Sequence, residues 1–426
     1  MHEYLPGLTE LQLPKMFRVR QQFDPQRIDD VVSAVHAQFE RPEIAQRLKP
    51  DMTIALGVGS RGIANIVDIV RAAVDVLKQR NIKVFIIPCM GSHGGATAQG
   101  QADVLDHLGI NEDSVGAPIR SSMDAVEIGE VTSTHGNQVK LYMDAIACEE
   151  AEGVIPINRI KPHTGFKGDV ESGICKMITI GLGKHIGCAR LHREGMTVFD
   201  HLIPTAGKAV LDTGRVPLAL ALVENGYEHP AVIEAVIAEK VIERERDLLA
   251  VAKDRMAKLL MSRIDVLVIE EVGKNISGVG MDANVTGRGE LGPMPFFQGP
   301  DIKRIVVLDL SSNTYGNAHG IGNADIITQK LFDQIDKTNT WTNTLTAGSL
   351  GCGQLPVALP DDRQAIMAAA ACVFGVPAEK AHIVRIKNTL CLTEIAVSES
   401  MLTAIENTDN CELQDEWDGK WHDHGD

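Results

Sequence analysis

The chain has 426 residues, 44% of them hydrophobic and 23% charged, which is typical of a globular protein with more than one domain. Its formal net charge of −16 argues against nucleic acid or an anionic membrane as partner, because those surfaces are bound by clustered Lys and Arg. The sequence shows no signal-peptide pattern, no run of the ~18 to 20 apolar residues that a membrane helix needs, and no CxxC pair among its eight cysteines. We therefore expect a cytoplasmic protein with reduced thiols.

The first half of the chain alternates short apolar strands with Gly-rich turns and helices. Strands are predicted at 52–58, 82–88 and 152–161 from their β-branched runs. Apolar residues three and four apart predict a helix over 63–77, and a second helix is predicted over 96–109. This order is typical of βαβ units on a mainly parallel sheet.

The second half begins with a long segment, 230–262, that has no internal Gly or Pro and keeps a helical period. We expect one or two helices there, joining two domains. Further strands are predicted at 263–274, 302–312 and 381–389, with a helix at 365–375. The predicted fold class is α/β, with two α/β domains facing each other across a cleft and joined by a long helix. The predicted parts are an N-terminal domain (1–261), a C-terminal domain (262–405) and a polar acidic, poorly ordered tail (406–426).

Gly-rich turns follow four of the predicted strands, at 57–65, 89–97, 158–168 and 270–289. In α/β sheets, ligands bind at the carboxyl ends of strands. We therefore expect the four turns to line one cleft. The first turn, "GVGSRGI", would let backbone N–H groups and Arg61 approach an anion, although its spacing differs from GxGxxG. The alternative is an ordinary strand-to-helix turn with a solvated arginine.

Two loop histidines are candidates for acid or base catalysis. His93 lies in "MGSHGG" directly after a strand, and His163 lies between Lys161 and Lys167 in "KPHTGFKGD". The imidazole pKa lies near neutrality, and the two lysines would lower it and favour the neutral base. The lysines could also receive a carboxylate. The alternatives are an incidental surface histidine and a solvated basic turn.

The segment 158–192 contains three histidines, six lysines and arginines, and six glycines, a composition that neither a helix nor a strand favours. It supplies Lys176 and His192, with Lys184 and His185 as second choices that structural reasons can explain. No HxxH or HExxH signature is present, so a metal here would take most of its ligands from elsewhere in the protein or from a bound cofactor.

The second-domain turns are rich in small and polar residues, as in a ligand loop, although Asn and Asp are also ordinary turn formers. Hydrolase elbows, P-loops, kinase motifs and paired metal-binding carboxylates are missing from the sequence. The polar residues of these turns are Lys274, Asn275, Ser277, Asp282, Asn284 and Arg288, followed by Asn317, His319, Asn323 and Asp325.

The ordered motifs "GSR", "MGSHGG", "KPHTGF" and "ESGICKM", followed by His192, resemble the lactate racemase superfamily over roughly residues 50–330. The resemblance implies a nickel-pincer nucleotide, a pyridinium-3,5-bisthiocarboxylic acid mononucleotide that holds Ni through a ring carbon and two sulfurs. This likeness implies the following roles: Lys176 as the covalent cofactor lysine, Ser60 and Arg61 as cofactor contacts, His192 as the nickel ligand, and His93 and His163 as acid/base residues.

The activity implied by the resemblance is that of an isomerase, a racemase or epimerase that inverts C2 of a 2-hydroxy acid by reversible hydride transfer. Arg61, Lys274 and Arg288 would bind the substrate, and the implied protein partners are the cofactor-making and loading enzymes. The sequence departs from the family at Val58 and Gly59, where an Asp and a His are expected. A second-domain lysine is also displaced, and Gly280 and Met281 stand near its place. A polar 2-hydroxy acid or sugar acid therefore fits at least as well as lactate.

Two other functions agree with the same residues. One is a cofactor-independent isomerase or lyase that uses His93 and His163 as bases on a carboxylate substrate. The other is a two-domain protein that only binds a small anion. The sequence gives no indication of the oligomeric state.

Overall fold

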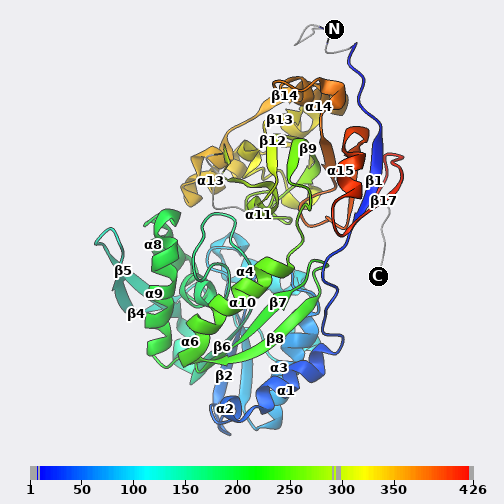
Figure 1. The fold of residues 1–426 in the computed structure, drawn as a ribbon. Coiled ribbons are helices and arrows are strands. Elements are labelled where there is room, and N and C mark those ends of the chain that lie inside the picture. Colours follow the sequence, from blue (N-terminus) through cyan, green and yellow to red (C-terminus); the bar gives the residue numbers. More distant parts are fainter. Residues whose placement is uncertain (1–6, 8–9, 290–291, 294–298, 422–426) are drawn as a thin grey trace. The chain divides into compact units, whose positions relative to one another are not determined.

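The computed structural model describes residues 7, 10–289, 292–293 and 299–421. The chain forms two compact units (Figure 1). The central unit is Asp24–Met256, and the terminal unit combines Met1–Phe23 with Ala257–Asp426. Each unit contains a largely parallel sheet with helices, which confirms the predicted α/β class.

The central unit is built on a five-stranded sheet in the order β3-β2-β6-β7-β8. The first four strands are parallel, and β8 is antiparallel to β7. The predicted strands are confirmed at β2, β3 and β6. The bounds are β2 Thr53–Val58, β3 Lys83–Pro88, β6 Gly153–Arg159, β7 Leu218–Glu224 and β8 Pro230–Ile237, with a separate hairpin of β4 Ala125–Thr132 and β5 Gln138–Asp144.

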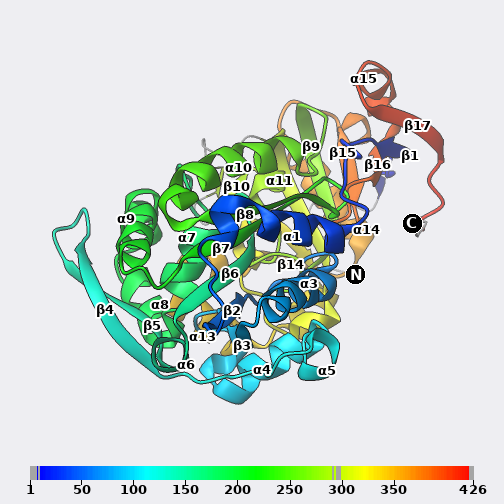
Figure 2. The same ribbon diagram turned by 90° about the horizontal axis from the view of Figure 1, so that it is seen from below.

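Apolar side chains on both faces of this sheet are buried. Ile54 and Leu56 of β2 pack on one face with α1 and α3, whereas Ala55 packs on the opposite face with α9 and α10 (Figure 1, Figure 2). Successive side chains of a strand point to opposite faces, so a strand covered on both sides is apolar throughout. The helices are α1 Val31–Glu40, α2 Pro42–Ala45, α3 Ile66–Gln79, α4 Ala98–His107, α5 Glu112–Val115, α6 Ala145–Glu150, α7 Ile174–Lys176, α8 Lys184–His192, α9 Phe199–Asp212 and α10 Val241–Arg255.

The prediction of helix from residue 230 onward is wrong for its first part. Pro230–Ile237 forms β8, and the helix begins only at Val241. The turn before β8 is held by Asn225, whose side chain accepts from the N–H groups of Tyr227 and His229. This turn brings the β-branched run back beside β7, and antiparallel pairing then overrides the helical spacing.

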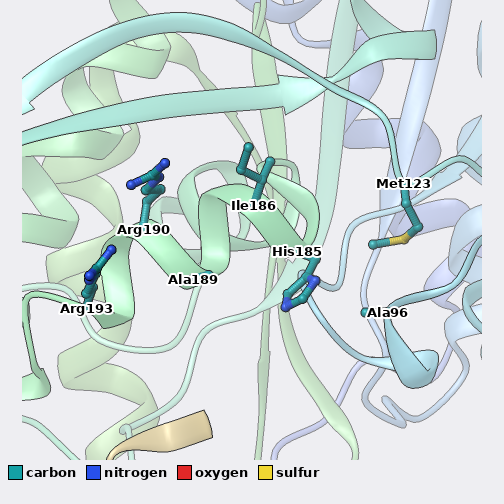
Figure 3. Close-up of a pocket in the computed structure, with 7 residues that line it drawn as sticks. All are labelled: Ala96, Met123, His185, Ile186, Ala189, Arg190 and Arg193. Carbon is teal, nitrogen blue, oxygen red and sulfur yellow. The ribbon is translucent and has the colours of Figure 1, made fainter.

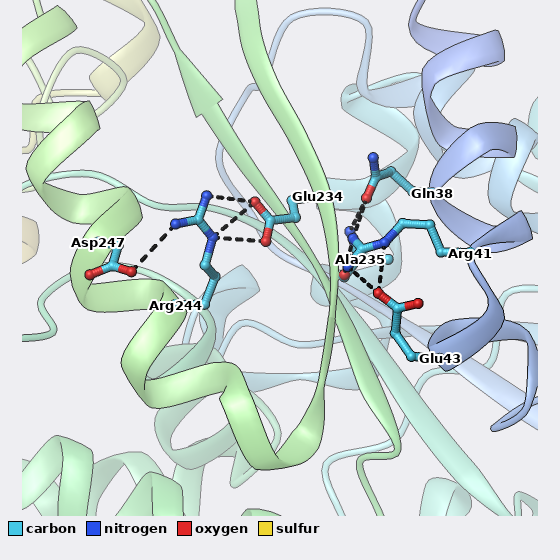
Figure 4. Close-up of polar contacts among 7 residues, drawn as sticks. All are labelled: Gln38, Arg41, Glu43, Glu234, Ala235, Arg244 and Asp247. Atoms are coloured by element: carbon cyan, nitrogen blue, oxygen red, sulfur yellow. Dashed lines mark hydrogen bonds and ion pairs between the residues drawn. The ribbon is translucent and has the colours of Figure 1, made fainter.

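Side chains cover the open edge of β8 (Figure 4). Gln38 Oε1 accepts from the N–H of Ala235 at 3.1 Å, and Arg41 donates to the carbonyl of the same residue at 3.0 Å. Arg244 of α10 pairs with Glu234 at 2.8 Å. The edge strand therefore has fewer backbone groups open to another chain.

The terminal unit contains an eight-stranded sheet in the order β14-β13-β12-β9-β15-β16-β1-β17. The strands from β14 to β15 are parallel to their neighbours, and β16, β1 and β17 pair antiparallel. Its strands are β1 Met16–Gln21, β9 Arg263–Val272, β12 Asp301–Leu310, β13 Ile326–Thr328, β14 Val357–Leu359, β15 Ile383–Ile386, β16 Glu394–Ser398 and β17 Cys411–Glu416, beside a small pair of β10 Arg288–Gly289 and β11 Gly292–Pro293. Its helices are α11 Ala283–Thr286, α12 Gln329–Gln334, α13 Lys337–Ala347, α14 Asp362–Ala371 and α15 Leu402–Glu406.

Both ends of the chain depart from the predicted division at 261 and 405. β1 lies between β16 and β17, so the N-terminal segment belongs with the C-terminal half. The predicted disordered tail supplies β17, and only its residues 422–426 lie outside the described part. Buried Arg18 pairs with Glu394, Asp415 and Asp418, which fastens the acidic tail to β1. An exposed edge strand can consist of polar residues, and its sequence then resembles that of a disordered segment.

Candidate active site

Three Gly-rich loops of the central unit leave the carboxyl ends of neighbouring strands. Residues 59–65 follow β2, residues 89–97 follow β3, and residues 160–168 follow β6. Because β2 lies between the other two strands in a parallel sheet, the loops share one edge, as the sequence predicts. The fourth predicted loop, 270–289, follows β9 in the terminal unit.

His93 is exposed on the loop after β3, and its ring is tied to the loop after β2. Ser60 Oγ lies 2.5 Å from His93 Nδ1, and the backbone N–H of His93 donates to the Met90 carbonyl at 3.1 Å. A hydrogen bond to one ring nitrogen fixes the orientation of an imidazole. Ser60, which the resemblance assigns to the cofactor, therefore also orients His93.

His163 is partly buried on the loop after β6. Its Nδ1 accepts from the Gly165 N–H at 2.9 Å, and its Nε2 lies 2.7 Å from the amine of Lys176. Burial is the main cause that holds the pKa of His163 well below its ordinary value, followed by the charges of Lys176 and His192. Lys167 and Lys161 lower this pKa less. The predicted direction is confirmed, but burial matters more than the two lysines.

Lys176 closes α7, and its amine loses its proton more readily than that of an ordinary lysine. Burial, followed by the charge of Arg61, lowers the pKa of Lys176 to about 8. The neutral ring of His163 carries its proton on Nε2, because Nδ1 already accepts a hydrogen bond. That Nε2–H can only donate to the Lys176 nitrogen, which must then offer a lone pair. The hydrogen-bond geometry therefore favours the uncharged, nucleophilic amine, and the lowered pKa makes that form easier to reach than in an ordinary lysine.

Glu171 anchors the loop that carries His163. Its fully buried carboxylate accepts from the His163 N–H at 2.7 Å and pairs with Lys253 of α10 at 2.7 Å. Lys167 lies 3.4 Å from the same carboxylate. The sequence analysis did not select Glu171. In the sequence, its spacing of four residues from Lys167 indicates an ion pair. Lys253 is too distant in the chain for its contact with Glu171 to be predicted.

A second buried carboxylate caps the helix that carries Lys176. Glu245 of α10 accepts from the Cys175 N–H at 2.8 Å. A Cβ atom on Gly173 would lie 2.2 Å from the Glu245 carboxylate, so a larger residue there would displace this cap. The turn after Lys176, Met177–Gly181, is a π-helix, a rare geometry that is often found at functional sites.

His192 ends α8 with one ring nitrogen engaged by its own helix. Nδ1 donates to the Cys188 carbonyl at 2.8 Å and lies 3.5 Å from the Cys188 sulfur. In the neutral ring the lone pair is therefore on Nε2, the atom that would bind a metal. Burial raises the pKa of the Cys188 thiol, but the hydrogen bond and charge of His192 outweigh it, so that pKa is lowered. The sequence analysis did not select Cys188, although it lies one helical turn before His192.

Two aromatic rings connect His192 to His163. The His192 ring meets Phe199 edge-on at 5.3 Å, Phe199 meets Phe166 at 5.5 Å, and Phe166 lies 4.5 Å from the His163 ring. Of the predicted site residues, the structure thus brings His163, Lys176 and His192 into one cluster. Within the described ranges, no three His, Cys, Asp or Glu side chains are grouped to hold a metal. A metal at His192 would need ligands from a bound molecule.

The two second-choice residues of α8 lie on different faces of the helix. Lys184 is fully buried and pairs with Asp144 at 2.7 Å. His185 is exposed and lines an open pocket of about 490 Å³ (Figure 3). The pocket also contains Ala96 of the His93 loop, Met123, Ile186, Ala189, Arg190 and Arg193.

The predicted substrate-binding residues have different surroundings. Arg61 is exposed after β2, where its charge contributes to the lowered pKa of Lys176. Lys274 lies in the terminal unit, and its backbone N–H donates to Thr314 at 3.2 Å. Arg288 is buried, with its guanidinium 2.5 Å from Asp325 and 2.8 Å from the Lys303 carbonyl. Arg288 also lines a pocket of about 420 Å³, and its assignment to substrate binding stays a prediction.

Polar loops of the terminal unit follow β9 and β12, which are neighbours in its sheet. Gly320, with φ of +102°, packs so closely that a Cβ would lie 1.8 Å from the Val279 carbonyl oxygen. Burial, followed by the charge of Lys274, lowers the pKa of His319 to about 4. Met281, near the place where the resemblance implies a lysine, is fully buried.

No protein-family model matches the chain, and no curated protein matches its sequence. Two solved structures are similar to it in fold. The lactate racemase apoprotein from Thermoanaerobacterium thermosaccharolyticum has a TM-score of 0.53 at 13% identity, covering 92% of this chain and 96% of that one. A structural-genomics crystal structure from Thermotoga maritima has a TM-score of 0.52 at 12% identity, covering 85% and 97%.

At that level of identity the likeness concerns the fold. The mixed α/β chain is thus similar in its fold to a lactate racemase apoprotein over nearly its whole length. Across the described residues, no helix is both long and apolar enough to cross a membrane.

Proposed function

We propose that the protein is a racemase or epimerase that inverts C2 of a 2-hydroxy acid and depends on a nickel-pincer nucleotide. The observation that carries this proposal is the pairing of Lys176 with His163, with His192 in the same aromatic cluster. The fold likeness to lactate racemase apoprotein supports it. So does the order of the site motifs along the chain.

The residues present fit such a cofactor. Covalent attachment through an amide-type bond needs an uncharged amine, and the lowered pKa of Lys176 makes that state more accessible than in an ordinary lysine. A pincer that brings its own carbon and sulfur ligands leaves one nickel position to the protein, and His192 Nε2 can fill it once any proton has left it. When bound, the cofactor supplies an electrophilic ring carbon that accepts a hydride and returns it.

His93 and His163 act as the acid/base pair in this proposal. Inversion requires a proton acceptor for the 2-hydroxyl group on each side of C2. Ser60 holds the ring of His93 in place, and burial keeps the ring of His163 neutral, with its lone pair on Nδ1. Acylation of Lys176 removes the basic lone pair to which His163 Nε2–H donates. Attachment of the cofactor would therefore release His163 toward the substrate.

We infer that the substrate is a polar 2-hydroxy acid or a sugar acid. Arg61, exposed beside Lys176, is the candidate for the substrate carboxylate, because a guanidinium binds carboxylates in a bidentate manner. Val58 and Gly59 replace the Asp and His expected in the family, and Met281 is buried. The contacts that the resemblance implies for lactate are therefore incomplete in this chain.

A cofactor-independent isomerase or lyase is the second candidate. The neutral imidazole of His163 favours it, because a base on a carboxylate substrate needs only that state. An isomerase of this kind would remove the C2 hydrogen as a proton and exchange it with solvent. Full activity in metal-free protein lacking any adduct would favour it over the first proposal.

Co-production with the cofactor-making enzymes tests the first proposal. We expect stoichiometric nickel and an added mass that maps to Lys176, both of them lost in Lys176→Arg. Lys208→Arg, at an exposed lysine of α9 paired with Asp212, is the matched control and should keep both signals. Absence of nickel and adduct from the unmodified chain would contradict the proposal.

A further inference from the structure

One buried side chain holds the backbone of the loop that carries His93. Gln101 of α4 is fully buried, and its amide Nε2 donates to the Gly91 carbonyl at 2.9 Å and to the His93 carbonyl at 3.2 Å. Both of its N–H bonds thus hold backbone atoms of this one loop. A buried amide that loses such partners destabilises the local structure, so these contacts define the loop conformation.

The other end of the Gln101 amide is fixed by a buried ion pair. Lys184 Nζ lies 3.4 Å from Gln101 Oε1, donates to the Pro88 carbonyl at 2.8 Å, and pairs with Asp144 at 2.7 Å. The side chains of Lys184, Asp144 and Gln101 are all fully buried. We call these residues the buried brace. It connects the end of β3, the start of α4, α6 and α8.

Close backbone packing leaves the loop little room to shift on this brace. Gly94 has a φ of +64°, and a Cβ there would lie 2.5 Å from the backbone carbon of Gly100. A Cβ on Gly100 would lie 2.0 Å from the Gly94 oxygen. The loop therefore rests directly on the first turn of α4, one residue before Gln101.

We infer that Gln101 is a positioning residue for His93, held in its rotamer by Lys184 and Asp144. Gln101 sets the backbone from which the imidazole projects, and Ser60 sets the rotation of the ring. The brace side chains are fully buried and act through the backbone of the loop. The inference rests on the proposed function only in that His93 is taken to react with the substrate.

Full-chain variants of α4 test this role. Gln101→Met keeps the length of the side chain and removes both donors. Gln101→Glu keeps an acceptor for Lys184 and also cannot donate to the loop carbonyls. Gln99→Met is the matched control, because Gln99 is exposed on the same helix and its side chain donates to Asp103.

The first readout is the NMR spectrum of isotope-labelled histidine rings in protein without cofactor, with the His93 signal assigned from His93→Gln. The second is kcat and KM of the cofactor-loaded enzyme. We expect both Gln101 variants to shift or broaden the His93 signal and leave that of His192 in place. We expect kcat to fall about 10- to 100-fold, with little change in KM, because small displacements of a reacting group have effects of that size.

Signals of His93 and values of kcat that match those of Gln99→Met would overturn the inference. If Gln101→Met does not fold, Gln101→Glu decides by the same two readouts. A displaced His93 signal in a protein whose unmodified form has no racemase activity would support the positioning role and contradict the proposed function. The two ideas can therefore fail separately.

Discussion

The surroundings of Lys176 suit the covalent role proposed for this residue. An ordinary lysine is protonated at neutral pH and cannot act as a nucleophile, whereas burial and Arg61 bring the pKa of Lys176 to about 8. His163 adds a directional constraint, because its Nε2–H points at the amine nitrogen. The imidazole of His163 therefore constrains Lys176 beyond its effect on the pKa. Its hydrogen bond can form only when the amine nitrogen of Lys176 has a lone pair.

The reactivity of Lys176 in protein without cofactor should follow this pKa. Trace acylation with acetic anhydride should rise to half its maximum at about pH 8, where an ordinary lysine with a pKa of about 10.4 is under about 1% neutral. Peptide mass spectrometry after acylation over a pH series measures this for each lysine. Lys208, which is exposed, serves as the internal control. A midpoint for Lys176 equal to that of Lys208 would contradict the neutral-amine geometry.

The depressed pKa of Lys176 also has a stability cost. The unfolded chain binds a proton below about pH 10.4, whereas the folded chain holds it only below about pH 8, so the folded state is penalised below that value. The penalty disappears as pH rises through this window. Lys176→Met should therefore stabilise the cofactor-free protein at neutral pH by about 1 to 3 kcal/mol. Urea unfolding at neutral pH and near pH 10 checks the sign, since the gain should shrink at the higher pH.

At the scale of secondary-structure elements, the buried pair of Lys184 and Asp144 joins α8 to the start of α6. Asp144 also caps α6 by accepting from the Ala147 N–H at 2.9 Å. Lys184 has a φ of +52°, which a residue other than glycine adopts only when the surroundings hold it there. Burial removes both side chains from water, and Lys184 also has a strained backbone conformation. The ion pair between them compensates these costs.

Breaking this pair from one side should be more harmful than removing both charges. Lys184→Met leaves a buried carboxylate without its cation and should lower the free energy of unfolding by about 3 to 5 kcal/mol. Adding Asp144→Asn, which keeps the cap of α6, should restore a substantial part of that loss. Chemical denaturation of both variants measures the difference. A double variant no more stable than Lys184→Met alone would show that the ion pair is not the source of the effect.

The elements that the sequence predicts best are those whose local pattern agrees with their tertiary surroundings. β2, β3 and β6 are apolar runs between Gly-rich turns, and both local propensity and burial favour a strand. β8 is different, because its spacing also fits a helix and only pairing with β7 selects the strand. The same limit applies to the site. Gln101 and Glu171 contact residues that are distant in the sequence, Lys184 and Lys253. No local motif predicts such contacts.

At the scale of the whole molecule, the chain starts in the terminal unit, forms the central unit and then returns to the terminal unit. β1 is an interior strand of that unit although it comes first in the sequence, and the acidic segment that forms β17 completes the sheet beside it. A division in sequence order misses this arrangement, since short polar strands carry little hydrophobic signal. The ion pairs of Arg18 with its acidic partners supply part of the attachment that hydrophobic side chains provide in other strands.

The central unit should fold without the rest of the chain. Its sheet, both of its hydrophobic clusters and the pair of Lys176 with His163 lie within Asp24–Met256. We expect a fragment of residues 24–256 to unfold cooperatively and to keep the low acylation midpoint of Lys176. Circular dichroism and the acylation series check both properties. Deletion of residues 1–23 from the full chain should instead destabilise the terminal unit, because it removes β1.

In the proposed reaction, C2 inversion proceeds by hydride removal and return at a site built around Lys176. The most direct test uses polar 2-hydroxy acids and sugar acids deuterated at C2, incubated in ordinary water with the cofactor-loaded enzyme and followed by NMR and chiral separation. We expect an inverted product that keeps its deuterium at C2, together with loss of turnover in Lys176→Arg. Inversion with deuterium released to water, or unchanged turnover after that substitution, would contradict it.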